Sequence, residues 1–316
     1  MTLRLAVVGV GHMGRFHAQK AKALEEEGIE LVAVVDREIE RARSVATEFG
    51  VAAFDDLSQA SSGLDAVIVA VPTISHAEVV GEALHAGLDV LVEKPIAATL
   101  HEAEQLIAQA RKAGRIVQVG HLEWFNAAMR KAAERIRRPL FIEAHRLGPF
   151  PDRATDVDVV RDLMIHDLDL IQRVVGDEPE RIEAVGVPVI TERVDIANAR
   201  LTFRSGCVAN VTASRVSPQP LRKIRFFQVD GYLSVDLLER ELVLAERGAP
   251  DADGRREISL ERVAIDRTDA LEAQLRSFRD AVKSRSVGEG AADHGLAALR
   301  SALRVIEAMP ALEPFT

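Results

Sequence analysis

Cysteine is nearly absent from the 316-residue chain, in which Cys207 stands alone. A single thiol cannot form an internal disulfide, and no spacing of metal ligands surrounds it. The sequence therefore predicts neither a disulfide framework nor a metal centre. We expect Cys207 to be a small apolar residue within a strand.

Long apolar runs and an excess of positive charge are also missing. No stretch reaches the roughly 18 apolar residues that a membrane-spanning helix needs, and the N-terminus starts a strand pattern without a signal peptide. The net charge of −9 argues against a nucleic-acid or anionic-membrane partner. We therefore predict a cytoplasmic protein, with 47% hydrophobic residues to fill two cores.

The sequence does contain a strand, a glycine-rich turn and a helix pattern within residues 1–40. The apolar run 3–8 leads into Gly9-Val10-Gly11-His12-Met13-Gly14, and a second apolar run, 31–35, ends at Asp36. This arrangement is typical of a dinucleotide-binding unit, whereas an isolated glycine turn would be a weak signal.

Each glycine of this turn has an expected role. Gly9 supplies the positive φ of a tight turn, Gly11 lets the backbone approach a pyrophosphate, and Gly14 lets the helix pack closely on the strand. The helix that follows then offers its N–H groups and the positive end of its dipole to the phosphates.

Asp36 indicates which dinucleotide is bound. A carboxylate at the end of the second strand accepts hydrogen bonds from ribose hydroxyls and repels a 2′-phosphate, which favours NAD over NADP. The neighbouring Arg37 leaves NADP open, because an arginine there could bind that phosphate.

Strand and helix patterns alternate up to about residue 120, as in a parallel sheet with helices on both faces. We predict an α/β fold whose N-terminal domain, residues 1–120, is a Rossmann doubly wound parallel sheet of six strands. Strands are expected at 3–8, 31–35, 66–71, 90–92 and 116–119, and helices after Gly14 and at 39–49, 75–86 and 100–113.

Beyond residue 120 the strand patterns follow one another without helices between them, which indicates an antiparallel sheet. We predict a C-terminal α+β domain, residues 121–316, built on an open, mostly antiparallel sheet. Strands are expected at 139–147, 182–190, 194–203, 207–214, 224–229, 232–238, 242–245 and 258–260. Helices are expected at 125–137, 159–175, 268–284 and 291–309, a turn-rich segment at 150–158 and a polar loop at 247–256.

Ligands of a doubly wound sheet lie beyond the carboxyl ends of its strands. Candidates stand at three of these ends, namely Val71 and Pro72 with His76, the triplet Glu93-Lys94-Pro95, and His121. A lysine at the end of a buried strand is an unusual position for a solvated charge, although a plain surface lysine is the alternative. The predicted cofactor-binding residues are Gly9, Gly11, His12, Met13, Gly14, Asp36, Arg37, Val71, Pro72, His76, Glu93 and Lys94.

A second polar cluster lies in the helix pattern 159–175. Asp162 and His166 are four residues apart, so one helical face carries both. A carboxylate beside an imidazole raises its basicity and fixes its tautomer, which suits removal of a proton from an alcohol. Asp169 could brace His166 from the other side. The alternative is an acidic helix surface with an incidental histidine.

Taken together, these motifs resemble the glucose-fructose oxidoreductase, inositol dehydrogenase and rhizopine-catabolism family, Gfo/Idh/MocA. The resemblance covers essentially the whole chain. It implies a Rossmann domain followed by an open antiparallel sheet, a tightly held nicotinamide cofactor, and oxidation or reduction of a sugar carbon. It also implies that the C-terminal sheet forms the interface of a homodimer or homotetramer.

A narrower resemblance is to the branch of this family that acts on UDP-N-acetylglucosamine. It is carried by residues 119–126, by 155–169 and by 227–236. That branch oxidises the sugar 3-hydroxyl so that an aminotransferase can install an amine, in some bacteria for lipid A, which implies an aminotransferase as a metabolic partner. The branch usually has Arg at the position of Trp124 and Pro at that of Ala127.

The departure at Trp124 affects how a diphosphate would be bound. An indole can stack on a sugar or uracil ring but cannot replace the charged hydrogen bonds of an arginine. A diphosphate must then be bound by Arg130, Arg146 or Arg153. The predicted substrate-binding residues are Lys94, Trp124, Asn126, Arg130, Arg146, Arg153, Asp162 and His166.

The residues predicted to be catalytic are Lys94, Asp162 and His166. His166 would remove the hydroxyl proton, Asp162 would orient it, and Lys94 would stabilise charge on the same oxygen. A desolvated Lys94 could be the base instead. Alternatives to a nucleotide-sugar dehydrogenase are a dehydrogenase of a free sugar, inositol or a biliverdin-like acceptor, a nonenzymatic NAD-binding regulator, and a scaffold.

Overall fold

The computed structural model describes residues 2–150, 157–250, 256–266 and 268–311. The chain forms two compact units. The first contains residues 1–122 and 269–296, and the second contains residues 123–268 and 297–316. The sequence predicts one C-terminal domain over residues 121–316, whereas in the structure residues 269–296 belong to the first unit.

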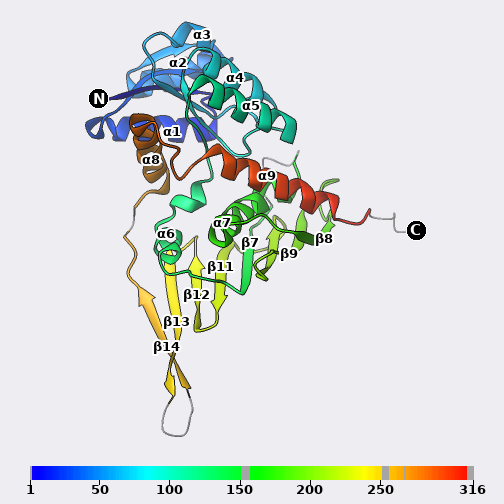
Figure 1. The fold of residues 1–316 in the computed structure, drawn as a ribbon. Helices are drawn as coiled ribbons and strands as arrows, with labels where there is room; N and C mark the ends of the chain where they lie inside the picture. The colour runs from blue at the N-terminus through cyan, green and yellow to red at the C-terminus, as the bar shows by residue number, and fades with distance from the viewer. Residues whose placement is uncertain (1, 151–156, 251–255, 267, 312–316) are drawn as a thin grey trace. The chain divides into compact units, whose positions relative to one another are not determined.

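The first unit, whose helices α1 to α5 are drawn in blue to cyan in Figure 1, is built on a six-stranded parallel sheet in the order β3-β2-β1-β4-β5-β6. This is the doubly wound order, so the predicted Rossmann sheet is confirmed. The third strand, for which no residue range was predicted, is short. The strands are β1 (Leu3–Val8), β2 (Ile29–Val35), β3 (Ala52–Phe54), β4 (Ala66–Val69), β5 (Asp89–Val92) and β6 (Val117–Val119).

Helices cover this sheet and connect its strands. They are α1 (His12–Ala23), η1 (Glu25–Glu27), α2 (Ile39–Phe49), α3 (Leu57–Ala60), η2 (Thr73–Ser75), α4 (His76–His85), α5 (Leu100–Ala113) and α8 (Ala270–Ser284). Helix α5 begins with a complete capping box, in which Thr99 and Glu102 each accept a hydrogen bond from the other's backbone N–H. Its C-cap Gly114 has φ 63°, a conformation that favours glycine.

Helix α8 belongs to the first unit because its apolar face completes that unit's core. Leu275, Phe278 and Ala281 are buried in one cluster with Leu5 of β1 and Ile29 of β2. Lys20 of α1 reinforces the contact, since its Nζ lies 2.8 Å from the carboxylate of Asp269 at the N-cap of α8. The last helix, α9 (Ala292–Glu307), begins in the first unit and continues into the second.

The second unit is built on an eight-stranded sheet in the order β14-β13-β12-β11-β7-β10-β9-β8. Only β7 and β10 pair in parallel, and every other pair of neighbours is antiparallel, so the predicted mostly antiparallel sheet is confirmed. The strands are β7 (Phe141–Leu147), β8 (Arg181–Val187), β9 (Ile196–Thr202), β10 (Val208–Ser214), β11 (Leu221–Gln228), β12 (Gly231–Asp236), β13 (Glu241–Pro250) and β14 (Arg256–Val263).

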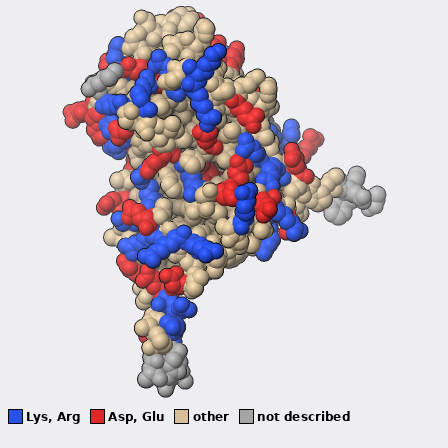
Figure 2. Space-filling model, in the orientation of Figure 1, with Lys and Arg blue, Asp and Glu red and all other residues tan. Residues whose placement is uncertain are grey.

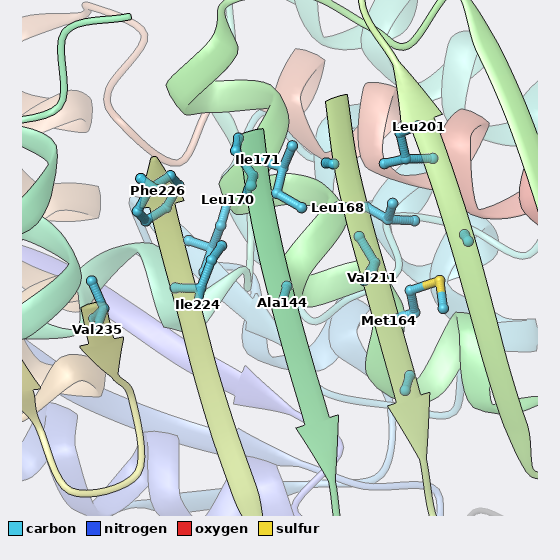
Figure 3. Close-up of a cluster of buried hydrophobic side chains, with 14 of the residues drawn as sticks. Ala144, Met164, Leu168, Leu170, Ile171, Leu201, Val211, Ile224, Phe226 and Val235 are labelled. Carbon is cyan, nitrogen blue, oxygen red and sulfur yellow. The ribbon is translucent and has the colours of Figure 1, made fainter. Parts of the chain in front are cut away.

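One face of this sheet packs against helix α7 (Ile165–Val175). Ala144, Val211 and Ile224 alternate with more exposed residues along their strands and are fully buried. In Figure 3 they lie with Leu168 and Ile171 of α7 in one apolar layer. The period of two along each strand therefore selects the residues that form the core of the second unit.

Two further segments differ from the sequence-based expectation. The polar loop predicted at 247–256 is partly strand, because β13 continues to Pro250 and β14 starts at Arg256. The helix predicted at 125–137 is shorter, with a 3-10 turn η3 (Leu122–Phe125) before α6 (Ala127–Ala133).

Lys, Arg, Asp and Glu side chains intermingle over the face drawn in Figure 2. Among the helices that the structure describes, none is long and apolar enough to cross a membrane.

Candidate functional site

The glycine-rich turn connects β1 to α1 in the first unit. Gly9 has φ 84°, and a Cβ there would lie 2.7 Å from the Val71 nitrogen. A Cβ on Gly14 would lie 1.8 Å from the Gly9 carbonyl oxygen. Neither position can accept a side chain without moving backbone, so these two glycines hold the turn and helix against the sheet.

Gly11 differs from these two glycines because a Cβ there would meet nothing within 4 Å. Gly11 is also the N-cap of α1, which begins at His12, and it supplies no side-chain cap to the helix. A hollow of about 550 Å³, lined in part by Gly11, His12 and Arg15, adjoins the turn. The helix start is thus open to a ligand, and its dipole favours an anionic one.

The Asp36 carboxylate is buried at the end of β2 and fastens the glycine turn. Its Oδ2 accepts the Val10 N–H at 3.0 Å, and its Oδ1 accepts the Glu38 N–H at 3.0 Å. Arg41 also contacts Asp36, with Nη1 3.2 Å from both oxygens. A ribose hydroxyl would therefore share this carboxylate with backbone N–H groups and a guanidinium.

The arginine beside Asp36 is thus Arg41, which the sequence analysis missed. Arg37 is exposed, and its Nη2 lies 2.9 Å from the carboxylate of Glu78 on α4. The sequence offered a signal, since Arg41 lies five residues after Asp36, in the first turn of α2.

His76 lies at the start of α4 and is buried. Its Nδ1 is 2.7 Å from the Pro95 carbonyl oxygen and its Nε2 is 3.0 Å from that of Val71. Burial lowers the pKa of His76 below its usual 6.5, although both carbonyls and Glu93 oppose the shift. A neutral ring has one N–H and can donate it to only one of these two carbonyls, so the imidazole is packed against the backbone of residues 71 and 95. A direct contact between His76 and a cofactor stays a prediction.

Glu93 and Lys94 follow β5, and their side chains differ in environment. The Glu93 carboxylate accepts a hydrogen bond from Nε2 of His17 on α1 at 2.7 Å, and its side chain is 14% exposed. Lys94 is half-buried and joins Pro95 through a cis peptide. Glu93, predicted to bind a cofactor, therefore contacts the helix that follows the glycine turn. His121, the candidate after β6, is buried.

The candidate catalytic pair of the second unit lies where two helix types meet. Asp162 is in a π-helical segment, η4 (Val160–Met164), and His166 is in the first turn of α7. Both are half-buried, whereas their neighbours Met164 and Ile165 are fully buried. The sequence predicts a single α-helix over 159–175, whereas the structure has a π-helical segment at its start. Such segments often mark functional sites.

Asp169 has a different partner from the one expected. Both of its oxygens accept hydrogen bonds from Nε of Arg173, at 2.9 and 2.8 Å, and the two side chains are almost fully buried. The Arg173 guanidinium in turn lies 5.1 Å from the centre of the Trp124 ring. Asp169 therefore helps to hold Trp124, through a cation–π contact, rather than acting on His166 as its main partner.

Arg146, predicted to bind a diphosphate, is buried in an ion-pair network. Its Nε and Nη2 donate to the two oxygens of Asp167 at 2.8 and 2.9 Å, and Nη1 donates to Glu123 at 2.7 Å. Burial opposes its charge, but the two carboxylates outweigh burial and raise the pKa of Arg146. This guanidinium is committed to Asp167 and Glu123, which argues against a role of Arg146 in binding a diphosphate.

The remaining predicted substrate residues of the second unit are Asn126, Arg130 and Arg153. Asn126 is the N-cap of α6, accepts the Ala128 N–H at 3.1 Å and donates to the Leu237 carbonyl at 2.9 Å. Arg130 is exposed on α6, and Arg153 lies outside the described residues. Arg222, a half-exposed residue whose Nη1 is 3.6 Å from Glu123, is a cation that the sequence analysis missed.

A second buried ion pair fixes the segment that precedes Asp162. Arg215 donates from Nε to Asp195 at 2.8 Å and from Nη1 to the Val157 carbonyl at 2.8 Å. The same Asp195 accepts the backbone N–H groups of residues 189–191. Burial opposes its charge, but these N–H groups and Arg215 outweigh it and hold the pKa of Asp195 well below its usual value.

These features define a class of protein. A glycine turn beneath an uncapped helix, with an acid after the second strand, is a dinucleotide-binding site. The profile of the oxidoreductase family with an NAD-binding Rossmann fold, Gfo/Idh/MocA, matches residues 3–121, and the profile of its C-terminal domain matches residues 105–234. The chain belongs to the Gfo/Idh/MocA family.

Individual relatives agree with this assignment. UDP-N-acetylglucosamine 3-dehydrogenase of Acidithiobacillus ferrooxidans is 39% identical over 281 residues, which cover 89% of this chain and 88% of that protein. A solved structure of that enzyme matches with a TM-score of 0.92 at 37% identity, covering 98% of each chain. Myo-inositol 2-dehydrogenase of Thermotoga maritima is 26% identical over 302 residues, 89% of each chain.

The fold extends to more distant proteins. Levoglucosan dehydrogenase, solved in complex with NADH, matches with a TM-score of 0.86 at 19% identity, covering 98% of this chain and 97% of that one. The chain is accordingly an NAD-dependent oxidoreductase that acts on CH–OH groups, as the family assignment and the named dehydrogenases among its relatives show.

Proposed function

We propose that this protein oxidises the 3-hydroxyl of UDP-N-acetylglucosamine to a ketone with NAD as the hydride acceptor. The observation that carries the proposal is the 39% identity to the Acidithiobacillus enzyme over 89% of the chain. The residues quoted for that branch, 119–126, 155–169 and 227–236, come from separate parts of the chain. Such a ketone would be the substrate of an aminotransferase, in lipid A or surface-sugar biosynthesis.

The first unit fits the NAD that this reaction requires. The open start of α1 at Gly11 suits the pyrophosphate, and Asp36 suits the adenosine ribose. NAD, when bound, supplies the acceptor for the hydride that leaves the sugar carbon. Gly9 and Gly14 hold the turn in the shape that admits it.

We assign the chemistry to Lys94, Asp162 and His166, on the basis of the family resemblance. His166 accepts the hydroxyl proton through a ring nitrogen, and Asp162 sets the orientation of the imidazole. Lys94 donates a hydrogen bond to the same oxygen and stabilises its developing negative charge. In the alternative assignment Lys94 is the general base, and the same three residues take part.

The diphosphate of the substrate requires cations other than Arg146. Arg222 and Arg130 are exposed cations of the second unit that we propose for this role, and Arg153 stays a prediction. The Trp124 ring lies against the Arg173 guanidinium, and we propose that it also contacts the sugar or uracil ring. We further propose a homodimer or homotetramer formed through the open face of the second sheet.

The experiment is to mix protein and NAD with UDP-N-acetylglucosamine, with free hexoses and with myo-inositol, and to follow NADH absorbance. A thermal shift with each compound is the second readout. The proposal expects turnover and stabilisation with the nucleotide sugar alone. Turnover of myo-inositol without a response to the nucleotide sugar would favour the second candidate, an inositol dehydrogenase, which the Thermotoga relative supports.

A further inference from the structure

We propose that His17 is a positioning residue for Lys94, acting through Glu93. The inference rests on the proposed function for the role of Lys94 itself. It adds a residue on the dinucleotide-binding helix that has no contact with the sugar in the proposed mechanism, yet is needed for the lysine to do its work.

The first observation is the contact between His17 and Glu93. His17 is on α1, three residues after Gly14, and is fully buried. Its Nε2 lies 2.7 Å from Oε1 of Glu93, a residue far away in the sequence at the end of β5. The pair joins the helix that begins at the glycine turn to the strand end that carries Lys94.

The second observation is that Glu93 is fixed at several points. Its other oxygen, Oε2, lies 3.3 Å from the Lys94 N–H. A Cβ on Gly120, after β6, would lie 3.1 Å from Oε2 and from the Glu93 Cα, so the carboxylate fills the space that this glycine leaves. The backbone is held too, because Glu93 N–H donates to the Val69 carbonyl at 2.9 Å. The Glu93 carboxylate is therefore held in one orientation, in which it contacts the backbone nitrogen of Lys94.

The third observation is electrostatic. Burial alone would raise the pKa of Glu93, but the hydrogen bond from His17 and the nearby charges of His17 and Lys94 outweigh it and lower that pKa. The titratable groups that face Glu93 are His17 from α1, Lys94 beside it, and His76 from α4, whose pKa Glu93 acts to raise. Gly120, from the end of β6, adds no charge. His17 is thus the hydrogen-bond donor from outside the strand that keeps a negative charge next to Lys94.

The test compares His17→Leu with His17→Gln. Leucine removes the donor, while a glutamine amide can still donate to Oε1. We expect kcat to fall about 10- to 100-fold in His17→Leu, because a displaced catalytic group costs rate in that range. The NAD dissociation constant should change less than about threefold, and the acidic limb of the kcat profile should move to higher pH. His17→Gln should recover most of the rate and the wild-type limb.

A matched control is Gln118→Leu on β6, a fully buried side chain whose amide has no hydrogen-bond partner within the described residues. Gln118 pairs with Leu91 of β5 and not with Glu93, so this substitution perturbs the core and should leave the pH profile in place. An unmoved acidic limb in His17→Leu would overturn the proposal, as would a fall in rate that His17→Gln does not reverse. If His17→Leu does not fold, His17→Asn, which is too short to reach Glu93, takes its place.

A cofactor-free readout separates this inference from the proposed function. Because the folded pKa of Glu93 lies below its usual 4.5, its contribution to stability is present above that pH and is lost on further acidification. The difference in Tm between wild type and His17→Leu should shrink as the pH falls below about 4.5, and a constant difference contradicts the inference. If no nucleotide sugar is turned over, the proposed function fails, but this measurement still tests His17.

Discussion

Arg146 forms a two-point ion pair with Asp167, the residue next to the candidate base His166. The guanidinium nitrogens lie 2.8 and 2.9 Å from the two carboxylate oxygens, and both residues are buried. Arg146 comes from strand β7 and Asp167 from helix α7, so the pair fixes helix α7 against the sheet.

Replacement of Arg146 by alanine leaves the buried Asp167 without its ion-pair partner and removes the nearer of the two cations from Glu123. We expect the free energy of unfolding to fall by about 3–5 kcal/mol, measured by urea denaturation. Arg222→Ala is the matched control, because Arg222 is half-exposed and its contact with Glu123, at 3.6 Å, is longer than that of Arg146. It should keep its stability and raise KM for the nucleotide sugar. Equal stability of the two variants would contradict the structural role of Arg146.

The glycine turn predicts opposite results for two alanine substitutions. Gly14→Ala places a Cβ 1.8 Å from the Gly9 carbonyl oxygen and should cost more than about 2 kcal/mol of stability. Gly11→Ala meets nothing within 4 Å, so stability should change by less than about 1 kcal/mol while NAD binding weakens. Thermal unfolding and NAD titration measure the two effects. A Gly11→Ala protein with normal NAD affinity would show that no ligand approaches this position.

We expect Asp36 to control the choice between NAD and NADP. Asp36→Asn keeps an acceptor for the Val10 N–H but removes the charge that favours ribose hydroxyls. The NAD dissociation constant should rise about 10- to 100-fold, as expected for loss of hydrogen bonds to a charged group, and the preference over NADP should narrow. Arg37→Ala is the control, since Arg37 pairs with Glu78 on the surface. A selectivity change in Arg37→Ala alone would transfer the role to that residue.

His76 makes stability depend on pH. Its folded pKa lies below the usual 6.5 because the ring is buried, so the unfolded chain binds the proton first. Stability is then highest above about pH 6.5 and is lost as the pH falls below it towards the folded value. The fall in Tm between pH 7 and pH 5 should be smaller in His76→Gln than in wild type. An identical fall in both proteins would exclude His76 as a source of this dependence.

The glycine turn and Asp36 could be predicted from sequence because their geometry is local. Gly9, Gly11 and Gly14 lie within one turn of chain, and the strand-to-acid spacing fixes Asp36. The order of the first sheet follows in the same way from alternating strands and helices.

The partners of buried charges could not be predicted in this way. Glu123, Arg146 and Asp167 are separated by 20 or more residues, as are His17 and Glu93. The burial of Arg146 could have been predicted, because Arg146 follows Ile142 and Ala144 at intervals of two residues and so lies on the same, buried face of β7. A charge on the buried face of a strand requires a partner, and this argues against a free guanidinium.

Helix α8 and the β13–β14 hairpin show two other limits. The sequence shows that α8 has an apolar face but not which core this face joins. The structure shows that it packs with residues of β1 and β2. Nearly every residue of β14 is exposed, so no alternation of buried and exposed side chains marks the ends of this strand, and the sequence predicts only residues 258–260 of it.

The most direct test of the central claim is an isotope transfer. Wild-type protein is incubated with NAD and UDP-N-acetylglucosamine deuterated at C3 of the sugar, and the NADH formed is analysed by mass spectrometry. Oxidation of the 3-hydroxyl predicts that the deuterium appears in the nicotinamide of NADH. Unlabelled NADH, or no NADH from the nucleotide sugar, would contradict the account.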